Sequence, residues 1–175
     1  MCEGSNEEII LNCLLDANVL KFTRDDLIGR RPYPIRQLSH PMIKTELKHY
    51  GLPVKVYRVG DKQNDKLSIP KDIKDIVSNN EIYKFCTKPE FEILLIINEG
   101  LIKEYEKVKS SESPKSFAKK YIKFNGMKYD QSSNFLFEYY GGKNIKSLID
   151  NIRRYKAYKK QHDKDELYLA DLLKK

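Results

Sequence analysis

The stretch "VKVYRV", residues 54–59, is the clearest strand signal in the chain, because apolar and polar residues alternate and three of the six are valine. Period-two alternation of this kind is typical of a strand with one buried face. Gly60 and a polar run, "GDKQNDK" at 60–66, end it. A second short strand is predicted at "IYKF", residues 82–85.

Helical patterns surround these two strands. Residues 6–15 place Ile9, Ile10, Cys13 and Leu14 on one helix face, and residues 40–51 carry Pro41 near the start and Gly51 past the end. Residues 18–28 are predicted to be a short strand or extended segment, 29–37 a loop, 70–80 a short helix and 90–109 one long helix. After residue 110, only helices are predicted: 114–124, 133–140, 143–160 and 165–175.

This order predicts an α/β fold in two parts. Helices and strands alternate up to about residue 100, which favours a small parallel-sheet core over residues 1–108. Residues 114–175 are expected to form a helical C-terminal extension that packs on this core as one globular unit.

Composition narrows the class of protein. The 175 residues are 40% hydrophobic and 33% charged, with a net charge of +8, as in a globular protein with a highly charged surface. No apolar run approaches the ~20 residues that span a bilayer, so we expect no membrane association and a cytoplasmic location. The three cysteines are too widely spaced for a zinc motif. The positive charge suits an anionic partner such as nucleic acid, but a solvated basic surface explains it equally well.

Carboxylates follow the predicted strand and precede the first helix. Glu3 lies before the helix, and Asp61 and Asp65 lie beyond residue 59. Sites in open parallel sheets form beyond the carboxyl ends of the strands, so we expect Glu3 and Asp61 to meet there. Clustered carboxylates favour a cation, and oxygen ligands suit Mg²⁺ or Mn²⁺. The alternative is that the aspartates serve only the turn and that Glu7 only complements the helix dipole.

Two segments carry a resemblance to a known family. "CEGSNEEIILNCLL", residues 2–15, resembles the opening of TOPRIM domains in bacterial phage-defence proteins of the RloB-like and OLD-family nuclease branch. "TKPEFEILLIINEG", residues 87–100, is similar to the segment that leads into an apolar helix in RloB-like proteins. The order of the pieces agrees over about residues 1–100.

The resemblance implies a metal-dependent phosphodiester nuclease with a TOPRIM fold. Carried over, Glu3 is the catalytic or metal-binding glutamate and Asp61 the first metal aspartate, while Glu7 and Glu92 match accessory glutamates. Two features depart from the pattern. The first strand is reduced to Met1 and Cys2, which points either to an upstream stretch or to a poorly held Glu3. The aspartates Asp61 and Asp65 are spaced D-x-x-x-D rather than D-x-D.

A basic loop is the candidate nucleic-acid contact. Its arginines match phosphates and the interleaved Tyr33 can stack on a base; they are Arg24, Arg30, Arg31 and Arg36. A solvated loop is the alternative.

Three hypotheses follow from the sequence. The first is an RloB-like nuclease of phage defence with catalytic Glu3 and Asp61, and with Mg²⁺ or Mn²⁺ held by Glu3, Asp61 and Asp65. The second is a catalytically degenerate module that binds nucleic acid or a protein partner in a defence or toxin system. The third is an unrelated α/β domain with a charged surface.

Overall fold

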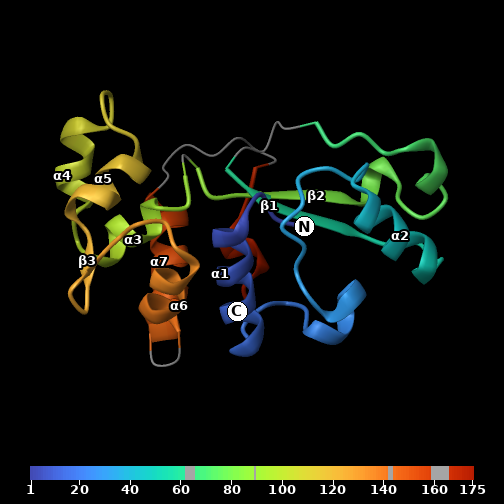
Figure 1. The fold of residues 1–175 in the computed structure, drawn as a ribbon, viewed down its shortest axis with the longest axis horizontal. Helices are drawn as coiled ribbons and strands as arrows, with labels where there is room; N and C mark the ends of the chain where they lie inside the picture. The colour runs from blue at the N-terminus through green and yellow to red at the C-terminus, as the bar shows by residue number, and fades with distance from the viewer. Residues whose placement is uncertain (62–65, 89, 142–143, 159–165) are drawn as a thin grey trace.

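A computed structural model of the chain describes residues 1–61, 66–88, 90–141, 144–158 and 166–175. The fold is mixed α/β, with a small parallel sheet and a group of helices from the C-terminal half of the chain, as the sequence predicts (Figure 1). None of the helices in these ranges combines the length and the apolar character that crossing a membrane requires.

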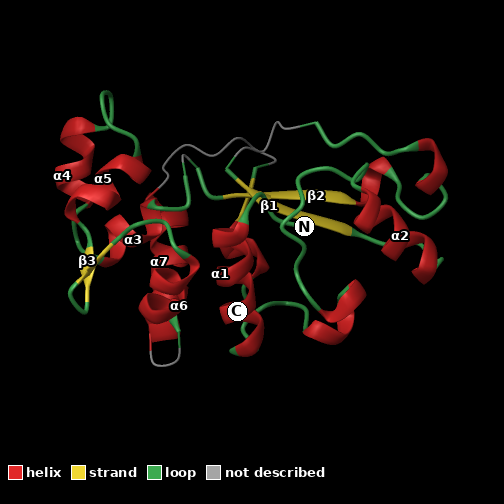
Figure 2. Ribbon diagram, viewed as in Figure 1, coloured by secondary structure: helices red, strands yellow, loops and turns green. Residues whose placement is uncertain are grey.

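The sheet has three parallel strands. They are β1 (Val56–Gly60), β2 (Ile82–Cys86) and β5 (Leu167–Tyr168), in the order β1-β2-β5. β1 and β2 pair along their full length, from Val56 beside Ile82 to Gly60 beside Cys86. On the opposite edge of β1, Cys2 forms a single parallel bridge with Val59. Residues 1–3, called the N-terminal stub below, therefore lie beside β1 (Figure 2).

Two helices follow the predicted pattern. α1 (Ser5–Asp16) begins directly after the stub and buries Ile10 and Leu14, which lie four residues apart on one face. α2 (Pro41–Tyr50) has Pro41 in its first turn and ends at Gly51, whose φ of 70° is the left-handed conformation common after a helix. Figure 1 shows α1 under the sheet and α2 at the far right, before β1 begins.

The remaining helices gather beyond the left end of the sheet (Figure 1). Ser113 and Ser132 directly precede α5 and α6 and cap them, because their side chains accept hydrogen bonds from the backbone N–H groups of Ser116 and Phe135. An antiparallel hairpin, β3 (Lys123–Phe124) and β4 (Met127–Lys128), lies between these two helices. The helices are α3 (Ile93–Asn98), α4 (Ile102–Val108), α5 (Pro114–Tyr121), α6 (Ser133–Tyr140) and α7 (Ile145–Tyr158).

Three of the predicted elements differ from the structure in detail. The long helix over 90–109 is interrupted between α3 and α4 at Gly100, whose φ is 72°. The segment over 18–28 forms one antiparallel bridge, Leu20 with Leu173, and short 3₁₀ turns instead of a strand. Residues 70–80 form short 3₁₀ turns rather than an α-helix. The 3₁₀ turns are η1 (Arg24–Asp26), η2 (Ile28–Arg30), η3 (Lys71–Ile73), η4 (Asn79–Glu81) and η6 (Leu169–Leu172).

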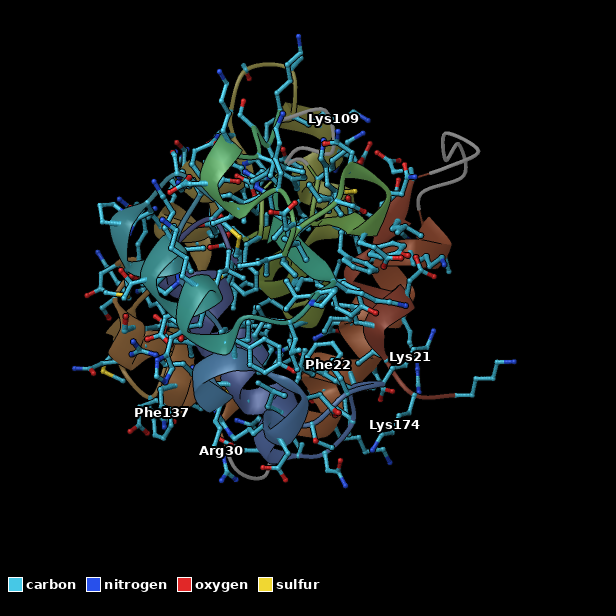
Figure 3. All side chains as sticks on the ribbon, turned by 90° about the vertical axis from the view of Figure 1, so that its right-hand side faces the viewer. Lys21, Phe22, Arg30, Lys109, Phe137 and Lys174 are labelled. Carbon is cyan, nitrogen blue, oxygen red and sulfur yellow. The ribbon has the colours of Figure 1, made fainter. Side chains whose placement is uncertain are left out.

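The C-terminal segment gives the largest correction. Residues 165–175 were predicted to be a helix, but Leu167 and Tyr168 form β5 and pair with Phe85 and Cys86 of β2. Figure 3 shows Lys21 and Lys174 close together, because Lys21 N–H donates to the Leu172 carbonyl and Lys174 N–H to the Val19 carbonyl. The C-terminal half of the chain therefore returns to the sheet rather than forming helices alone.

Buried apolar residues form two clusters on opposite faces of the sheet. The larger cluster joins α1, α3, α6 and α7 to β2 and includes Leu14, Phe85 and Leu94. The smaller cluster joins α2 and the preceding loop to the start of β1 and includes Leu38, Leu47 and Val56. β1 separates them, since its alternate side chains point to opposite faces.

Candidate functional site

Glu3 and Asp61 meet at the carboxyl end of β1, where the sequence places them. The Asp61 N–H donates to Glu3 Oε2 at 3.0 Å. The Glu3 N–H donates to the Val59 carbonyl at 3.0 Å, which fixes the stub against the strand. Asp65 lies outside the described residues. The structure thus joins two of the three predicted metal ligands.

The absence of a side chain at Gly60 lets the Glu3 carboxylate approach the backbone of β1 closely. A methyl group on Gly60 would lie 2.8 Å from Glu3 Oε2, which is closer than non-bonded atoms pack. The neighbouring strand adds a further contact, because the Thr87 hydroxyl donates to Asp61 Oδ1 at 3.5 Å, at the limit of a hydrogen bond. The Thr87 N–H donates to the Gly60 carbonyl at 3.1 Å. Both edges of the β1 end are therefore occupied by the residues that orient Asp61.

The two accessory glutamates lie inside the protein. Glu7 is 8% exposed in the first turns of α1, and Glu92 is 2% exposed directly before α3. Glu92 Oε1 accepts a hydrogen bond of 2.8 Å from the Tyr129 hydroxyl. A third acid, Glu90, accepts the Lys115 N–H at the start of α5 at 2.9 Å. Acidic side chains from four segments thus converge on the β1 end.

Burial and the neighbouring acids raise the pKa values of Asp61 and Glu7. Burial, followed by the charges of Glu3, Glu7, Glu90 and Glu92, raises the pKa of Asp61 to about 7. Burial also raises the pKa of Glu7, and the charges of Glu3 and Glu92 add to the shift. The ionised cluster is therefore costly, and a nearby cation would lower the pKa values of its carboxyl groups.

The donor set suits a hard divalent ion. Carboxylate oxygens are the ligands that Mg²⁺ and Mn²⁺ prefer, and Mg²⁺ commonly takes one or two protein carboxylates and completes its shell with water or phosphate oxygens. Within the part of the chain that the structure describes, no group of three or more His, Cys, Asp or Glu side chains is arranged to hold an ion. Among the described residues, Glu3 and Asp61 are the pair that could hold an ion here, with non-protein oxygens in its shell.

Two arginines border the carboxylates. Arg36 Nη2 lies 3.4 Å from Glu3 Oε1, and Arg36 Nε donates to the Glu3 carbonyl at 3.1 Å. Arg58 on β1 is 2% exposed, and its Nη1 lies 3.2 Å from the point that a Gly60 methyl group would occupy. The alternating pattern of residues 54–59 predicts that the polar Arg58 faces solvent, whereas the structure buries it. Its one available signal is that it shares a strand face with Gly60.

The other arginines of the predicted nucleic-acid loop lie elsewhere. Arg24 pairs with Asp16 at 2.7 Å, and Arg30 pairs with Asp25 at 2.8 Å. The Arg31 guanidinium lies over the Tyr33 ring, 5.1 Å from its centroid. Figure 3 shows Arg30 at the end of the molecule opposite Lys109. Of the four arginines, only Arg36 contacts the acidic cluster, so their role in binding nucleic acid stays a prediction.

A lysine-rich surface lies on α5 and the hairpin that follows it. Four exposed lysines lie on α5 and the hairpin; they are Lys119, Lys120, Lys123 and Lys128. Lys123 and Lys128 are direct cross-strand partners, an arrangement that costs stability because the charges repel. The run "KSFAKKYIKFNGMK", residues 115–128, was the available signal.

Comparison with known proteins adds no assignment. No family model matches the chain, and no curated protein or solved structure matches it either.

Proposed function

We propose that the chain is a nuclease that hydrolyses phosphodiesters with Mg²⁺ or Mn²⁺, with a TOPRIM-like core of the RloB-related kind. The observation that carries the proposal is the Glu3–Asp61 pair at the carboxyl end of a parallel sheet, where burial and the charges of the surrounding acids raise the pKa of Asp61. Such a cluster is favourable when a cation shares it, and phosphodiester cleavage is the chemistry that this ion and a nucleic-acid partner would support together.

Each residue has a distinct task in this proposal. Glu3 and Asp61 would hold the ion, which would supply Lewis acidity to the phosphate and make a bound water more acidic. Thr87 and the Asp61 N–H keep the two carboxylates in position. Arg36, with its side chain 67% exposed, is placed to meet a phosphate oxygen when an ion takes over its contact with Glu3.

The lysine-rich surface of α5 and β3–β4 fits a polyanionic substrate. Glu90 joins the acidic cluster to the first turn of α5 through the Lys115 N–H. The exposed lysines of α5 and β3–β4 continue from there, with the half-exposed Tyr121 among them. Lysines neutralise phosphates without reading sequence, and a tyrosine ring stacks on an unpaired base. This favours a substrate with single-stranded character.

Cleavage assays on the purified chain test the proposal. Labelled single- and double-stranded DNA and RNA are incubated with Mn²⁺, Mg²⁺ or EDTA. We expect cleavage that EDTA abolishes and that Glu3→Gln and Asp61→Asn each lower by at least ~100-fold. Glu138→Gln, which removes an exposed carboxylate on α6, is the matched control and keeps full activity. The absence of ion-dependent cleavage on every substrate would rule out the nuclease.

One contact favours the alternative, a binding module without catalysis. Both oxygens of Glu3 already have protein partners, since Arg36 lies near Oε1 and the Asp61 N–H bonds to Oε2. In this alternative, Arg36 takes the place of an ion. Calorimetric titration with Mn²⁺ separates the two: the nuclease binds the ion and loses it in Asp61→Asn, whereas the binding module binds nucleic acid with no dependence on Mn²⁺. Absence of nucleic-acid binding at low salt would rule out both the nuclease and the binding module.

A further inference from the structure

The hairpin after α5 brings two lysine side chains close together. Its two-residue turn, 125–126, has positive φ values of 47° and 78°, as a type I′ turn requires. Lys123 and Lys128 are direct cross-strand partners, and the next pair is hydrogen-bonded, because the Tyr129 N–H donates to the Ile122 carbonyl at 3.0 Å. Since hydrogen-bonded and non-hydrogen-bonded pairs alternate, the lysines occupy a non-hydrogen-bonded position, where facing side chains are closest.

Both of these lysines point away from the protein interior. The adjacent Phe124 packs inward against Phe135 and Tyr139, with ring centroids 6.5 and 5.1 Å away. Successive side chains of a strand point to opposite faces, so Lys123 and its partner Lys128 lie on the outer face of the hairpin. Two exposed ammonium groups thus face solvent side by side.

The positive charge of this surface is not balanced by acids. On α2, by contrast, Lys44 and Lys48 share Asp72, each at 2.7 Å. Within the described part of the chain, no ion pair joins a carboxylate to any of the exposed lysines of α5 and the hairpin, which are Lys119, Lys120, Lys123 and Lys128. Repulsion among these charges is relieved when a polyanion binds.

One exposed aromatic ring lies among these lysines. Tyr121, at the end of α5, is 50% exposed and packs against the buried Phe117 ring, with centroids 4.6 Å apart. The Lys120 Nζ lies 5.0 Å from the Tyr121 ring centroid. A supported tyrosine ring can stack on an unpaired base, and the flexible Lys120 side chain can then move to a phosphate. The bases of a duplex already stack on one another, so this ring favours a single strand.

We propose that the lysine-rich surface binds single-stranded nucleic acid without a metal ion. In this complex, neighbouring phosphates lie on Lys123 and Lys128, and an unpaired base lies on Tyr121. Lys119 and Lys120 add further phosphate contacts. Binding itself does not require the acidic cluster, whereas the role of this surface as an anchor for a strand that is cleaved rests on the proposed nuclease.

Two hydrogen bonds connect the lysine-rich surface to the acidic cluster. The Lys115 N–H, at the start of α5, donates to Glu90, and the Tyr129 hydroxyl, directly after β4, donates to Glu92. Burial raises the pKa of Asp61, and the charges of these two glutamates add to that shift. Both ends of the unit that carries the lysines are therefore attached to acids that act on Asp61.

The test measures binding to the purified chain in EDTA, so that metal-dependent cleavage does not occur. Fluorescence anisotropy follows labelled single strands of DNA and RNA, about 20 nucleotides long, and the matching duplexes. The double variant Lys123→Gln/Lys128→Gln is compared with Lys44→Gln/Lys48→Gln, which removes the same charge from α2. Figure 1 shows α2 at the opposite end of the molecule from β3.

We expect the hairpin double variant to bind single strands at least ~10-fold more weakly. The slope of log affinity against log salt should fall by about 1.4, or about 0.7 for each phosphate contact that is lost. The α2 double variant should bind within about twofold of the unmodified chain. Equal affinities of the two double variants would overturn the proposal.

The Tyr121 ring separates a single strand from other polyanions. Tyr121→Ala should weaken single-strand binding by about 10-fold and leave duplex binding unchanged, whereas Tyr121→Phe keeps the ring and the affinity. Equal losses on single strands and duplexes would overturn the single-strand assignment. Tighter binding to phosphatidylserine vesicles than to single strands, lost in the hairpin double variant, would overturn it in favour of a membrane surface.

The same measurements distinguish this proposal from the nuclease. A chain that binds single strands in EDTA through Lys123 and Lys128 but never cleaves with Mn²⁺ supports the lysine-rich surface and refutes the nuclease alone. A chain that cleaves, and whose hairpin double variant binds and cleaves as well as the α2 double variant, refutes the lysine-rich surface alone.

Discussion

The two ends of β1 meet opposite surroundings. At its carboxyl end, Gly60 and Asp61 have hydrogen-bonding neighbours on both edges, and acidic side chains crowd around them. At its amino end, Val56 has β2 on one edge and an apolar cavity on the other. One short strand thus separates a polar region that is tightly connected from an apolar region that is loosely filled. The predicted chemistry lies at the end where the contacts are dense but the charges repel.

The largest expected difference between the two regions is the cost of deleting a buried apolar side chain. Phe85→Ala removes a buried ring that contacts Tyr57 with centroids 5.5 Å apart, and should lower the free energy of unfolding by about 3–5 kcal/mol. Leu47→Ala enlarges a wall that already borders open space and should cost only about 2 kcal/mol. Urea denaturation of both variants measures the difference. Equal losses would mean that the cavity region is as well packed as the rest.

The second contrast concerns a buried carboxyl group in the acidic region. Tyr129→Phe deletes the hydroxyl that donates to Glu92, which is 2% exposed, and should cost about 2 kcal/mol because a buried acceptor loses its partner. Tyr121→Phe, at a half-exposed tyrosine on α5, is the matched control and should change stability by less than about 0.5 kcal/mol. Thermal and urea unfolding measure both variants. Equal losses in the free energy of unfolding would contradict the prediction.

The third prediction uses the raised pKa of Asp61. Its folded-state pKa of about 7 exceeds the usual value of 3.8, so the folded chain binds more protons between these values and loses stability as the pH rises through them. Because the side chain is only partly buried, we expect a loss of about 1–2 kcal/mol between pH 4 and pH 8 without divalent ions.

Asp61→Asn should remove most of that slope and make the chain more stable at pH 8, since the variant carries no charge there. Mn²⁺ should restore stability to the unmodified chain at pH 8 but not to the variant. Urea unfolding across this pH range, with EDTA or Mn²⁺, gives both measurements. A slope that persists in the variant would assign the effect to another group.

The smallest effect is expected at Arg36. Its side chain is 67% exposed, so Arg36→Ala should change stability by less than about 0.5 kcal/mol, although it removes the cation beside Glu3. Mn²⁺ affinity should rise in the variant by several-fold, because repulsion of the ion is relieved. Arg30→Ala, which breaks an exposed pair with Asp25, should leave that affinity unchanged. Calorimetric titration of the three chains checks the difference.

The sequence was sufficient where local patterns decide the structure. The alternation at residues 54–59 located β1, and the Pro41–Gly51 spacing located α2. The meeting of Glu3 and Asp61 also followed from a general property of parallel sheets, once the strand and the helix after Glu3 were placed.

The features that could not be predicted from local sequence patterns depend on tertiary contacts. Leu167 and Tyr168 lie in a short apolar run that suits either a helix turn or a strand, and pairing with β2 selects the strand. Arg58 is buried because its strand face turns toward Glu3, which no local pattern specifies. Gly100 was included in a continuous helix, although its left-handed φ ends α3 before α4 begins. The cavity has no sequence signature, since distant segments form its walls.

The late position of β5 has a consequence for the order of folding during synthesis. Its Leu167 carbonyl accepts a hydrogen bond from the Cys86 thiol across 81 residues of chain. The edge of β2 that β5 covers stays unpaired until Leu167 and Tyr168 have been made. Likewise, the apolar helix α3 lacks the packing partner α7 until that helix has been made. Because long loops close slowly and exposed strand edges attract other chains, the newly made protein should be most prone to aggregation just before β5 has been made.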